Sequence, residues 1–304
     1  MKDGKPSETA HLVAAMRAHH FNTASEPRIL DDHLAGPLAG FQNAEDVASY
    51  LANITDRFAA IGDREAAEAM VAEITQGICM RSRLVEEQLA IVRERGLSQV
   101  VVLGAGMDSL AYRRLDLTRG LKVFEVDHPA TQKWKRAALA TIGTKTPDNL
   151  TFVAFDFEHQ TLAQALAEGG VDPAANTFFS WLGVQPYLTE ETVMATLAVL
   201  GAFPRGSQLV MDLVTPDDEA ADENVSDGFR QLLAVIASMG EPFLSRFTED
   251  AFMARLLQCG FSRASFDHPS KRSAALARYQ SWSPHMVPIR EGFAARFVTA
   301  DVAA

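Results

Sequence analysis

The sequence predicts an α/β protein built on a doubly wound, mostly parallel sheet. Short apolar runs follow one another from residue 99 onward, and segments with a helical pattern separate them. The first run, Gln99–Leu103, is apolar on both faces and leads into a glycine-rich turn. A run of that kind is typical of a buried parallel strand. Strand–helix alternation indicates right-handed βαβ units, which place helices on both sheet faces and ligands at the carboxyl ends of the strands.

The first 80 residues are predicted to be helical, with short breaks. Leu12 and Met16 show the apolar spacing of a helix, and strand-like runs do not occur there. A further amphipathic helix is expected from about Met80 to Arg95, because Gly96 then stands just beyond its end. We expect residues 1–80 to form a helical lid and residues 81–304 to form one core, rather than two independent domains.

The rest of the chain predicts seven strands and a helical insertion. The acidic stretch at 216–219 and the apolar stretch at 232–236 place that insertion after the fifth strand, at about 215–245. Helical patterns lie near 129–141, 160–168, 189–202 and 249–258. The expected strands are Gln99–Leu103, Leu121–Val126, Leu150–Phe155, Thr177–Leu182, Ser207–Leu213, Ser262–His268 and Phe293–Val302.

Composition and charge exclude several classes of protein. The 304 residues include 28 Lys and Arg against 39 Asp and Glu, a net charge of -11, which is unfavourable for a general nucleic-acid backbone binder. The start lacks an apolar signal region and no run approaches the roughly 18 apolar residues of a membrane span, so we expect a cytoplasmic protein without a membrane partner. Cys79 and Cys259 have no ligand-spaced neighbours, which disfavours a disulfide framework or a bound metal. The oligomeric state is not indicated.

The strongest local signal is the turn after the first strand, where Gly104 and Gly106 permit a tight bend and close approach of a ligand. Glu125 and Asp127 follow Gly104 by 21 and 23 residues, a spacing that suits a carboxylate binding ribose hydroxyls. A dinucleotide site usually has a third glycine where Ser109 stands, so the pattern favours a ligand with adenosine but no pyrophosphate. The alternative is a purely structural turn beside a solvated acid.

Two of these motifs carry a family resemblance. The runs VVLGAGMDSLAYR at 101–113 and VFEVDHP at 123–129 resemble the leucine carboxyl methyltransferase-like family of S-adenosylmethionine-dependent methyltransferases. SETAHLVAAMRAHH at 7–20 and LDDHLAGPLAG at 30–40 are similar to its bacterial branch, as are MRSR at 80–83 and WLGVQPYLT at 181–189. The resemblance implies a Rossmann-like class I methyltransferase fold, with S-adenosyl-L-methionine as the cofactor and S-adenosyl-L-homocysteine as its product.

The resemblance also implies roles for single residues. Arg81 would bind the methionyl carboxylate, for which a guanidinium fork is suited; otherwise it is a surface arginine. Gly104 and Gly106 would bring the backbone close to the methionyl and ribose groups, and Asp127 would accept the ribose hydroxyls. Glu125 is the less favoured acid, because strand alternation is expected to turn it to the other face or into a neighbouring network.

Further matches lie after the third and fourth strands. Asp156 would accept from the adenine amino group, and the backbone N–H of Phe157, where the family has Leu, would meet the ring; alternatively Asp156 caps the turn before Thr161. Leu182 stands where relatives commonly have Glu. A carboxylate expected near the methionyl ammonium group is therefore missing at that position.

The acceptor is less defined than the donor. An ionised carboxylate needs no general base, whereas an alcohol or phenol does. The resemblance favours O-methylation of a small-molecule carboxylate or hydroxyl in specialised metabolism. The alternatives are a catalytically silent S-adenosylmethionine-binding protein, a protein C-terminal carboxyl methyltransferase and, disfavoured by Ser109, a nicotinamide-dependent oxidoreductase. The catalytic candidates are His19 and His20 in the N-terminal layer and Tyr187 after the fourth strand. Arg17, Arg28 and His33 are further candidates in the N-terminal layer. The arginines and histidines of this layer are expected to form a local positive site together with Arg81.

Overall fold

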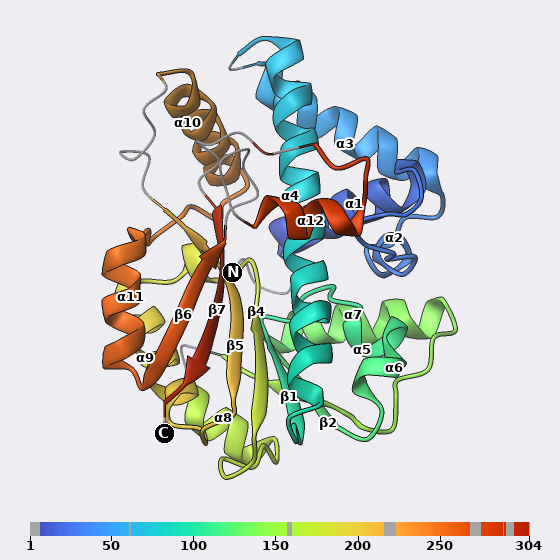
Figure 1. Cartoon of the computed structure of the whole chain (residues 1–304). Coiled ribbons are helices and arrows are strands. Elements are labelled where there is room, and N and C mark those ends of the chain that lie inside the picture. The colour runs from blue at the N-terminus through green and yellow to red at the C-terminus, as the bar shows by residue number, and fades with distance from the viewer. Residues whose placement is uncertain are drawn as a thin grey trace.

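The computed structural model describes residues 7–60, 62–156, 160–215, 223–267, 275–287, 289 and 295–303. Its centre is a seven-stranded sheet in the order β3-β2-β1-β4-β5-β7-β6 (Figure 1). The first five strands are parallel, and β7 runs antiparallel to both of its neighbours. The predicted fold class is confirmed. The strands are β1 (Gln99–Leu103), β2 (Lys122–Asp127), β3 (Leu150–Ala154), β4 (Thr177–Trp181), β5 (Gln208–Val214), β6 (Phe261–Asp267) and β7 (Ala295–Val302).

The strand ends agree with the predicted ones to within two residues, although His268 and Phe293, where two of the runs were expected to end or begin, lie outside the described residues. The order of the strands reverses at β1, which lies between β2 and β4. Leu103 of β1 is level with Val126 of β2 and Trp181 of β4. The segments that follow these three strands therefore leave the sheet side by side, at the switch point where open α/β sheets bind ligands.

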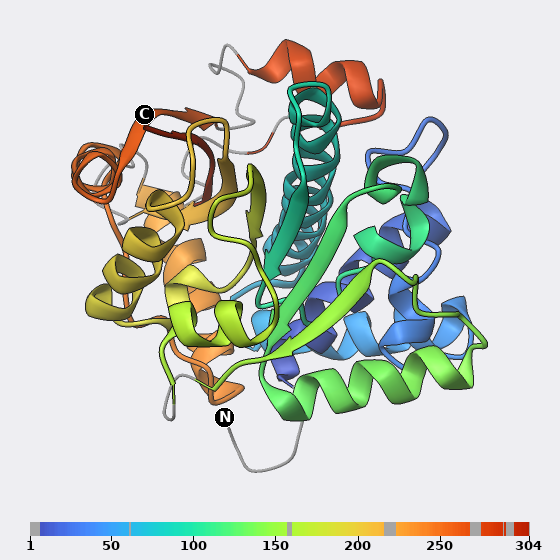
Figure 2. The same cartoon turned by 90° about the horizontal axis from the view of Figure 1, so that it is seen from below.

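Helices cover both faces of the sheet (Figure 2). Val100 and Val102 of β1 face a core shared with α4 (Arg64–Arg93), α5 (Leu110–Arg113), α6 (Leu115–Thr118), α7 (Pro129–Thr141) and α12 (Leu276–Trp282). Val101 and Leu103 face the opposite core, to which α8 (Leu162–Glu168), α9 (Glu190–Gly201) and α11 (Glu249–Gln258) contribute. The alternation of these four valine and leucine side chains explains why β1 is apolar throughout.

The N-terminal layer consists of α1 (Glu8–Thr23), α2 (Ala35–Leu38), α3 (Ala44–Ala59) and the first half of α4. The expected insertion after β5 contains α10 (Glu223–Ser238), which packs against this layer through Val235 and the following Met239. In Figure 1 the N-terminal layer and α10 stand above the sheet, and α4 runs from the N-terminal layer down along the sheet. Within the described part of the chain, no helix is both long and apolar enough to cross a membrane.

The helix predicted to begin near Met80 begins at Arg64, so the predicted start is wrong. Asp63 caps it, because its side chain accepts a hydrogen bond from the Ala66 N–H at 2.9 Å. Thr75 and Gly77 have low helix propensity and hide the continuity in the sequence. Both are buried in the structure, and packing against α1 and α3 overrides the local preference.

Candidate functional site

The turn after β1 is a tight bend that only glycine allows. Gly104 has φ +61° and its N–H donates to the Val126 carbonyl at 2.8 Å. A Cβ at Gly104 would lie 2.2 Å from Cγ2 of Val184, which comes from the segment after β4. Gly106 also has a positive φ, +46°, and there a Cβ would lie 3.5 Å from that of Ala10 in α1. Gly104 therefore lets the segment after β4 approach the end of β1 closely, and α1 lies within ordinary contact distance of Gly106.

Asp127 ends β2 beside this turn, and backbone N–H groups hold its carboxylate in place. Gly106 donates to Oδ2 and His128 donates to Oδ1, the latter at 2.6 Å. Burial raises the pKa of Asp127, and these two hydrogen bonds act in the opposite direction. A carboxylate has about four acceptor positions, so two remain for hydroxyl donors.

Glu125 takes no part in that arrangement. Its side chain lies on the same face of β2 as that of Asp127, so the expectation that alternation separates the two acids is wrong: residues two apart share a face. Glu125 instead lies two residues further from the carboxyl end of β2 and is fully buried. Its Oε2 is 2.7 Å from Nζ of Lys135 in α7. Burial raises the pKa of Glu125 to about 7, opposed by Lys135. The expected neighbouring network is thus the ion pair with Lys135.

Arg81 reaches the strand ends from α4. Its Nη1 donates to Oδ2 of Asp212 in β5 at 2.6 Å, and Oδ1 of Asp212 accepts from the Gly183 N–H at 2.6 Å. The exposed fractions of the Arg81 and Asp212 side chains are 12% and 6%, so this is a largely buried pair. Asp212 was missed in the sequence, although an acid inside the apolar run QLVMDLV is itself a signal.

Asp156 and Leu182 flank these residues. Asp156 follows β3, and its Oδ2 lies 3.8 Å from Nε2 of His128. Phe157, the other residue expected to meet an adenine ring, lies outside the described residues. Leu182 packs, partly buried, against the core on the α4 side of the sheet. The strand-end cluster is defined here as Arg81, Gly104, Gly106, Asp127, Gly183 and Asp212.

Tyr187 lies beside this cluster, in a single 3₁₀ turn at Gln185–Tyr187. Its ring meets Phe243 edge-on, with centroids 5.2 Å apart. Burial raises the pKa of Tyr187 to about 12, opposed by the Thr9 side chain, so the phenol stays protonated at neutral pH. Glu241 and the Arg81–Asp212 pair also act on this pKa, which places Tyr187 within their electrostatic reach.

The start of α1 is fastened over the glycine turn. Oε2 of Glu241 accepts from the Ser7 hydroxyl at 3.0 Å and from the Thr9 N–H at 3.2 Å. A carboxylate at a helix N-terminus complements the helix dipole. The first turn of α1 is thereby tied to the segment after α10.

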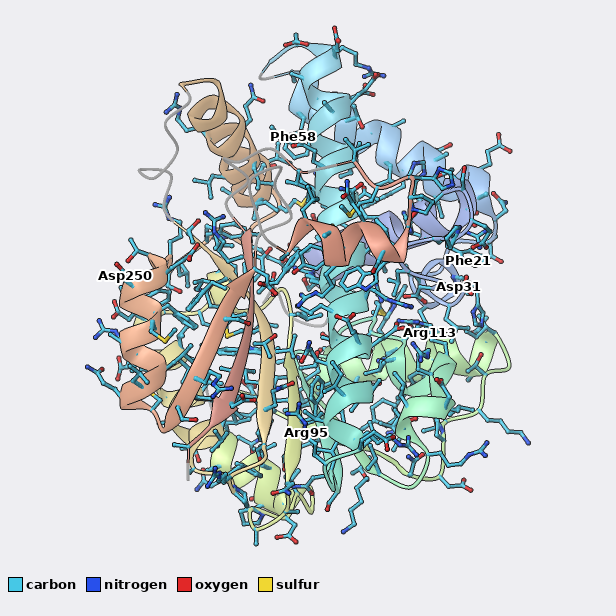
Figure 3. The ribbon with its side chains drawn as sticks, viewed as in Figure 1. Phe21, Asp31, Phe58, Arg95, Arg113 and Asp250 are labelled. Atoms are coloured by element: carbon cyan, nitrogen blue, oxygen red, sulfur yellow. The ribbon has the colours of Figure 1, made fainter. Side chains whose placement is uncertain are left out.

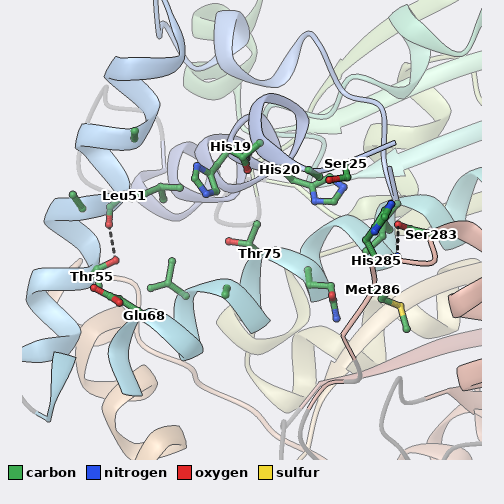
Figure 4. Close-up of a pocket in the computed structure, with 18 of the residues that line it drawn as sticks. His19, His20, Ser25, Leu51, Thr55, Glu68, Thr75, Ser283, His285 and Met286 are labelled. Carbon is green, nitrogen blue, oxygen red and sulfur yellow. Dashed lines mark hydrogen bonds between the residues drawn. The ribbon is translucent and has the colours of Figure 1, made fainter. Parts of the chain in front are cut away.

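His19 and His20 line a different site, a cavity of about 480 Å³ between α1, α3, α4 and the segment after α12 (Figure 4). Ala72 and Gln76 of α4 line it too. At about 100° per residue, Arg81 points roughly 180° away from Ala72 and 140° away from Gln76. The two histidines therefore face a cavity on the side of α4 opposite the strand-end cluster.

The remaining cationic candidates are engaged elsewhere. Arg17 donates to Asp32 at 2.8 Å and to the Met107 carbonyl at 2.7 Å, and Arg28 is paired with Glu26. Burial lowers the pKa of His19 and, to about 4, that of His20. The expected local positive site formed by the lid and Arg81 is therefore wrong, since acids or burial offset these charges. The ring of His33 lies near that of Phe21, with centroids 6.3 Å apart.

Arg17 and Asp32 belong to a buried ionic network that joins α1 to the core. Arg113 lies 3.6 Å from Asp32 and 2.5 Å from Glu86 of α4, and Arg114 also pairs with Glu86. In Figure 3 Arg113 lies between the N-terminal layer and the α5–α6 region. The network fixes α1 relative to Met107, and thus to the glycine turn.

The sheet order, the glycine turn at the switch point and the acid at the end of β2 are those of the Rossmann-like class I methyltransferase fold. The model of the family described as leucine carboxyl methyltransferase matches residues 10–201, so the chain belongs to that family of S-adenosylmethionine-dependent enzymes. The resemblance seen in the sequence is confirmed. The matched region contains Arg81, Asp127 and Asp156 but ends before Asp212.

Individual proteins agree with this assignment. The chain is 31% identical to YktD of Bacillus subtilis (strain 168), over 82% of this chain and 84% of that protein. It is 33% identical to a protein of Mycolicibacterium smegmatis, over 72% and 70%. Both carry the name "putative S-adenosyl-L-methionine-dependent methyltransferase". A solved DUF574 family protein from Streptomyces avermitilis has a similar fold, with a TM-score of 0.55 at 18% identity, covering 82% of this chain and 97% of that one.

Proposed function

We propose that the protein transfers a methyl group from S-adenosylmethionine to an oxygen atom of a small-molecule carboxylate or hydroxyl. The observation that carries the proposal is the strand-end cluster, which brings a glycine turn, a fixed acid and a buried arginine together at the switch point of the sheet. When bound, the cofactor supplies a methyl group on positively charged sulfur. The protein's task is to hold donor and acceptor in line.

The residues present fit such a donor. Asp127 keeps acceptor positions for two ribose hydroxyls while the backbone fixes its carboxylate. Arg81 offers the remaining N–H groups of its guanidinium to a carboxylate. Gly104 and Gly106 provide the close backbone approach, and Asp156, at the end of the adjacent strand, would accept from the adenine amino group. A role for Phe157 is part of the same proposal.

The environment of Tyr187 favours an acceptor that needs no general base. With its pKa raised to about 12, the phenol is a hydrogen-bond donor at neutral pH and can orient an acceptor oxygen. A carboxylate acceptor is already ionised there. The first turn of α1, tied to Glu241, lies over the glycine turn, which supports a small acceptor and a lid role for the N-terminal layer.

Calorimetry separates this proposal from a nicotinamide-dependent oxidoreductase. We expect S-adenosylmethionine and its product S-adenosylhomocysteine to bind the wild-type protein, NAD to give no heat, and Asp127→Ala to weaken binding of both adenosyl ligands. Tight NAD binding without heat from S-adenosylmethionine would exclude the proposal.

Methyl transfer itself is tested with donor carrying a labelled methyl group. Small carboxylic acids and phenols are screened with the wild-type protein, and label should appear in a product. If no label appears in a product across broad libraries while the donor still binds, a catalytically silent binding protein would be favoured. Leu182, which stands where relatives commonly have Glu, is the reason to test that alternative.

The assignment of Arg81 makes a quantitative prediction. Arg81→Ala should weaken binding of S-adenosylhomocysteine by about 1.5–3 kcal/mol, because a charge-assisted hydrogen bond is lost. Arg83→Ala is the matched control: Arg83 lies on the same helix, is 40% exposed and pairs only distantly with Glu86, so affinity should stay unchanged. Unaltered affinity in Arg81→Ala, measured by calorimetry, would refute the assignment.

A further inference from the structure

Asp212 is the one acidic side chain of β5, whose seven residues are all buried. Burying a carboxylate is costly unless it is paired and hydrogen-bonded. Asp212 meets both conditions: Oδ2 accepts from Arg81 and Oδ1 accepts from the Gly183 N–H, each at 2.6 Å. The three residues come from α4, β5 and the segment after β4, so Asp212 joins three elements at the strand ends.

This arrangement fixes the guanidinium of Arg81 from two sides. Nη1 is bound by Asp212, while Nη2 lies over Gly183, where a Cβ would be only 2.8 Å away. Gly183 has φ +68°, so glycine is required there for its backbone as well as for space. Among the described residues, Asp212 is the only hydrogen-bond partner of Arg81, which leaves the other guanidinium N–H groups for a ligand.

We propose that Asp212 is a positioning residue of the donor site, which holds Arg81 in the orientation that binds the amino-acid end of S-adenosylmethionine. The inference rests on the proposed function. It also bears on the departure at Leu182: with no carboxylate at that position, recognition of the amino-acid end depends on the Arg81–Asp212 pair. Gly183, the residue after Leu182, donates its N–H to Asp212.

The test dissects the ligand, because a residue that merely stabilises the fold would affect every ligand alike. Wild type and Asp212→Asn are titrated calorimetrically with S-adenosylhomocysteine and with 5′-methylthioadenosine, which lacks the amino-acid portion. We expect Asp212→Asn to weaken binding of S-adenosylhomocysteine about tenfold or more and binding of 5′-methylthioadenosine less than twofold. Arg81→Ala should show the same selectivity, and the double variant should bind no more weakly than Arg81→Ala alone.

Asp301→Asn is the matched control. Asp301 lies on β7 and accepts from Gln208, at the other end of β5, so its replacement should leave both affinities unchanged. Equal weakening of both ligands by Asp212→Asn, or no weakening at all, would overturn the inference. Failure of the wild-type protein to bind S-adenosylhomocysteine would instead overturn the proposed function.

A second pair of variants keeps the inference testable if Asp212→Asn does not fold. Gly183→Ala places a methyl group against Nη2 of Arg81 and should show the same selective loss of S-adenosylhomocysteine binding. Gly170→Ala controls for backbone strain, because Gly170 has φ +83° with no atom within 4 Å of the added Cβ. A loss of equal size in Gly170→Ala, or a loss that includes 5′-methylthioadenosine, would contradict the positioning role.

Discussion

Gly104 combines two physical requirements that are usually met at separate positions. Its φ of +61° is costly for a residue with a Cβ, and its Cα lies against Val184, so that a Cβ would overlap Cγ2 at 2.2 Å. Gly120 has the first property without the second: its φ is +81°, and no atom lies within 4 Å of an added Cβ. The two glycines therefore separate backbone strain from steric overlap.

We expect Gly120→Ala to lower the free energy of unfolding by about 1 kcal/mol, from backbone strain alone. Gly104→Ala should lower it by about 2–4 kcal/mol, since overlap is added to strain. Adding Val184→Ala to Gly104→Ala should recover part of the difference, because it removes the overlapping methyl group. Urea unfolding measures all of these values, and equal losses in the two glycine variants would contradict the interpretation.

The residues of the strand-end cluster differ in how far the sequence reveals them. Gly104 and Asp127 follow consecutive strands at a recognisable spacing, and the structure places both at one edge of the sheet. Asp212 was not predicted, because its partner Arg81 is 131 residues away and only packing of α4 against the sheet brings them together. For Glu125 the predicted separation from Asp127 is right but its reason is wrong. Both side chains lie on the same face of β2, and Glu125 is separated from Asp127 because it lies further from the end of the strand.

At the scale of elements, α1 is joined to the following loop by His20, whose Nε2 accepts from the Leu30 N–H at 3.4 Å. This bond requires the neutral imidazole. Burial lowers the pKa of His20 to about 4, so the unfolded chain binds a proton more readily than the folded protein does. The free energy of unfolding should therefore fall as the pH drops from about 6.5 towards 4.

His20→Gln removes this titration while its amide oxygen can still accept from Leu30. Between pH 7 and pH 4.5 the wild-type protein should lose on the order of 1–2 kcal/mol more than the variant, a value reduced for partial exposure to solvent. Urea unfolding at the two pH values checks this expectation. Parallel pH profiles for wild type and variant would show that His20 is not the titrating group.

The long helix α4 shows why some element boundaries escape sequence analysis. The amphipathic pattern predicted a start at about Met80, yet the helix runs without interruption from Arg64 to Arg93, through Thr75 and Gly77. Its buried side chains change packing partners within that span. Ile78 packs in the core of the N-terminal layer, whereas Cys79 and Met80 pack in the core on the α4 side of the sheet. A change of packing partner leaves no break in the helix itself.

For the whole molecule, the division into a lid of residues 1–80 and a core of residues 81–304 stays a prediction, and Leu30 and Leu38 of the first part pack in the same apolar cluster as Val100 of β1. The insertion helix α10 belongs physically with the lid, because Val235 and Met239 lie in the same apolar cluster as α1 and α3. Glu241 then ties the end of that insertion to the first turn of α1. The attachment of the first turn of α1 thus depends on segments more than 200 residues apart, as the separations of 232 and 234 residues show.

Glu241→Ala should loosen this connection. We expect faster amide hydrogen exchange in the first turn of α1, where the Thr9 N–H loses its acceptor, while exchange in β1 stays unchanged. Glu241→Gln, which keeps an acceptor oxygen, is the control and should retain most of the protection. Equal exchange of the α1 amides in wild type and Glu241→Ala would show that the hydrogen bonds of Glu241 do not hold the first turn of α1.

The fold class, the seven strands and the glycine turn could be predicted from local patterns, because they follow from periodicity and from conformations that few residues can adopt. Which charged side chains are already paired or buried became clear only from the folded chain. The fold paired Arg81 with Asp212 and Arg17 with Asp32, and it turned His19 and His20 towards a cavity on the far side of α4 from the cluster. The physical reason is that pairing and burial of charge depend on contacts between distant segments, which no local pattern contains.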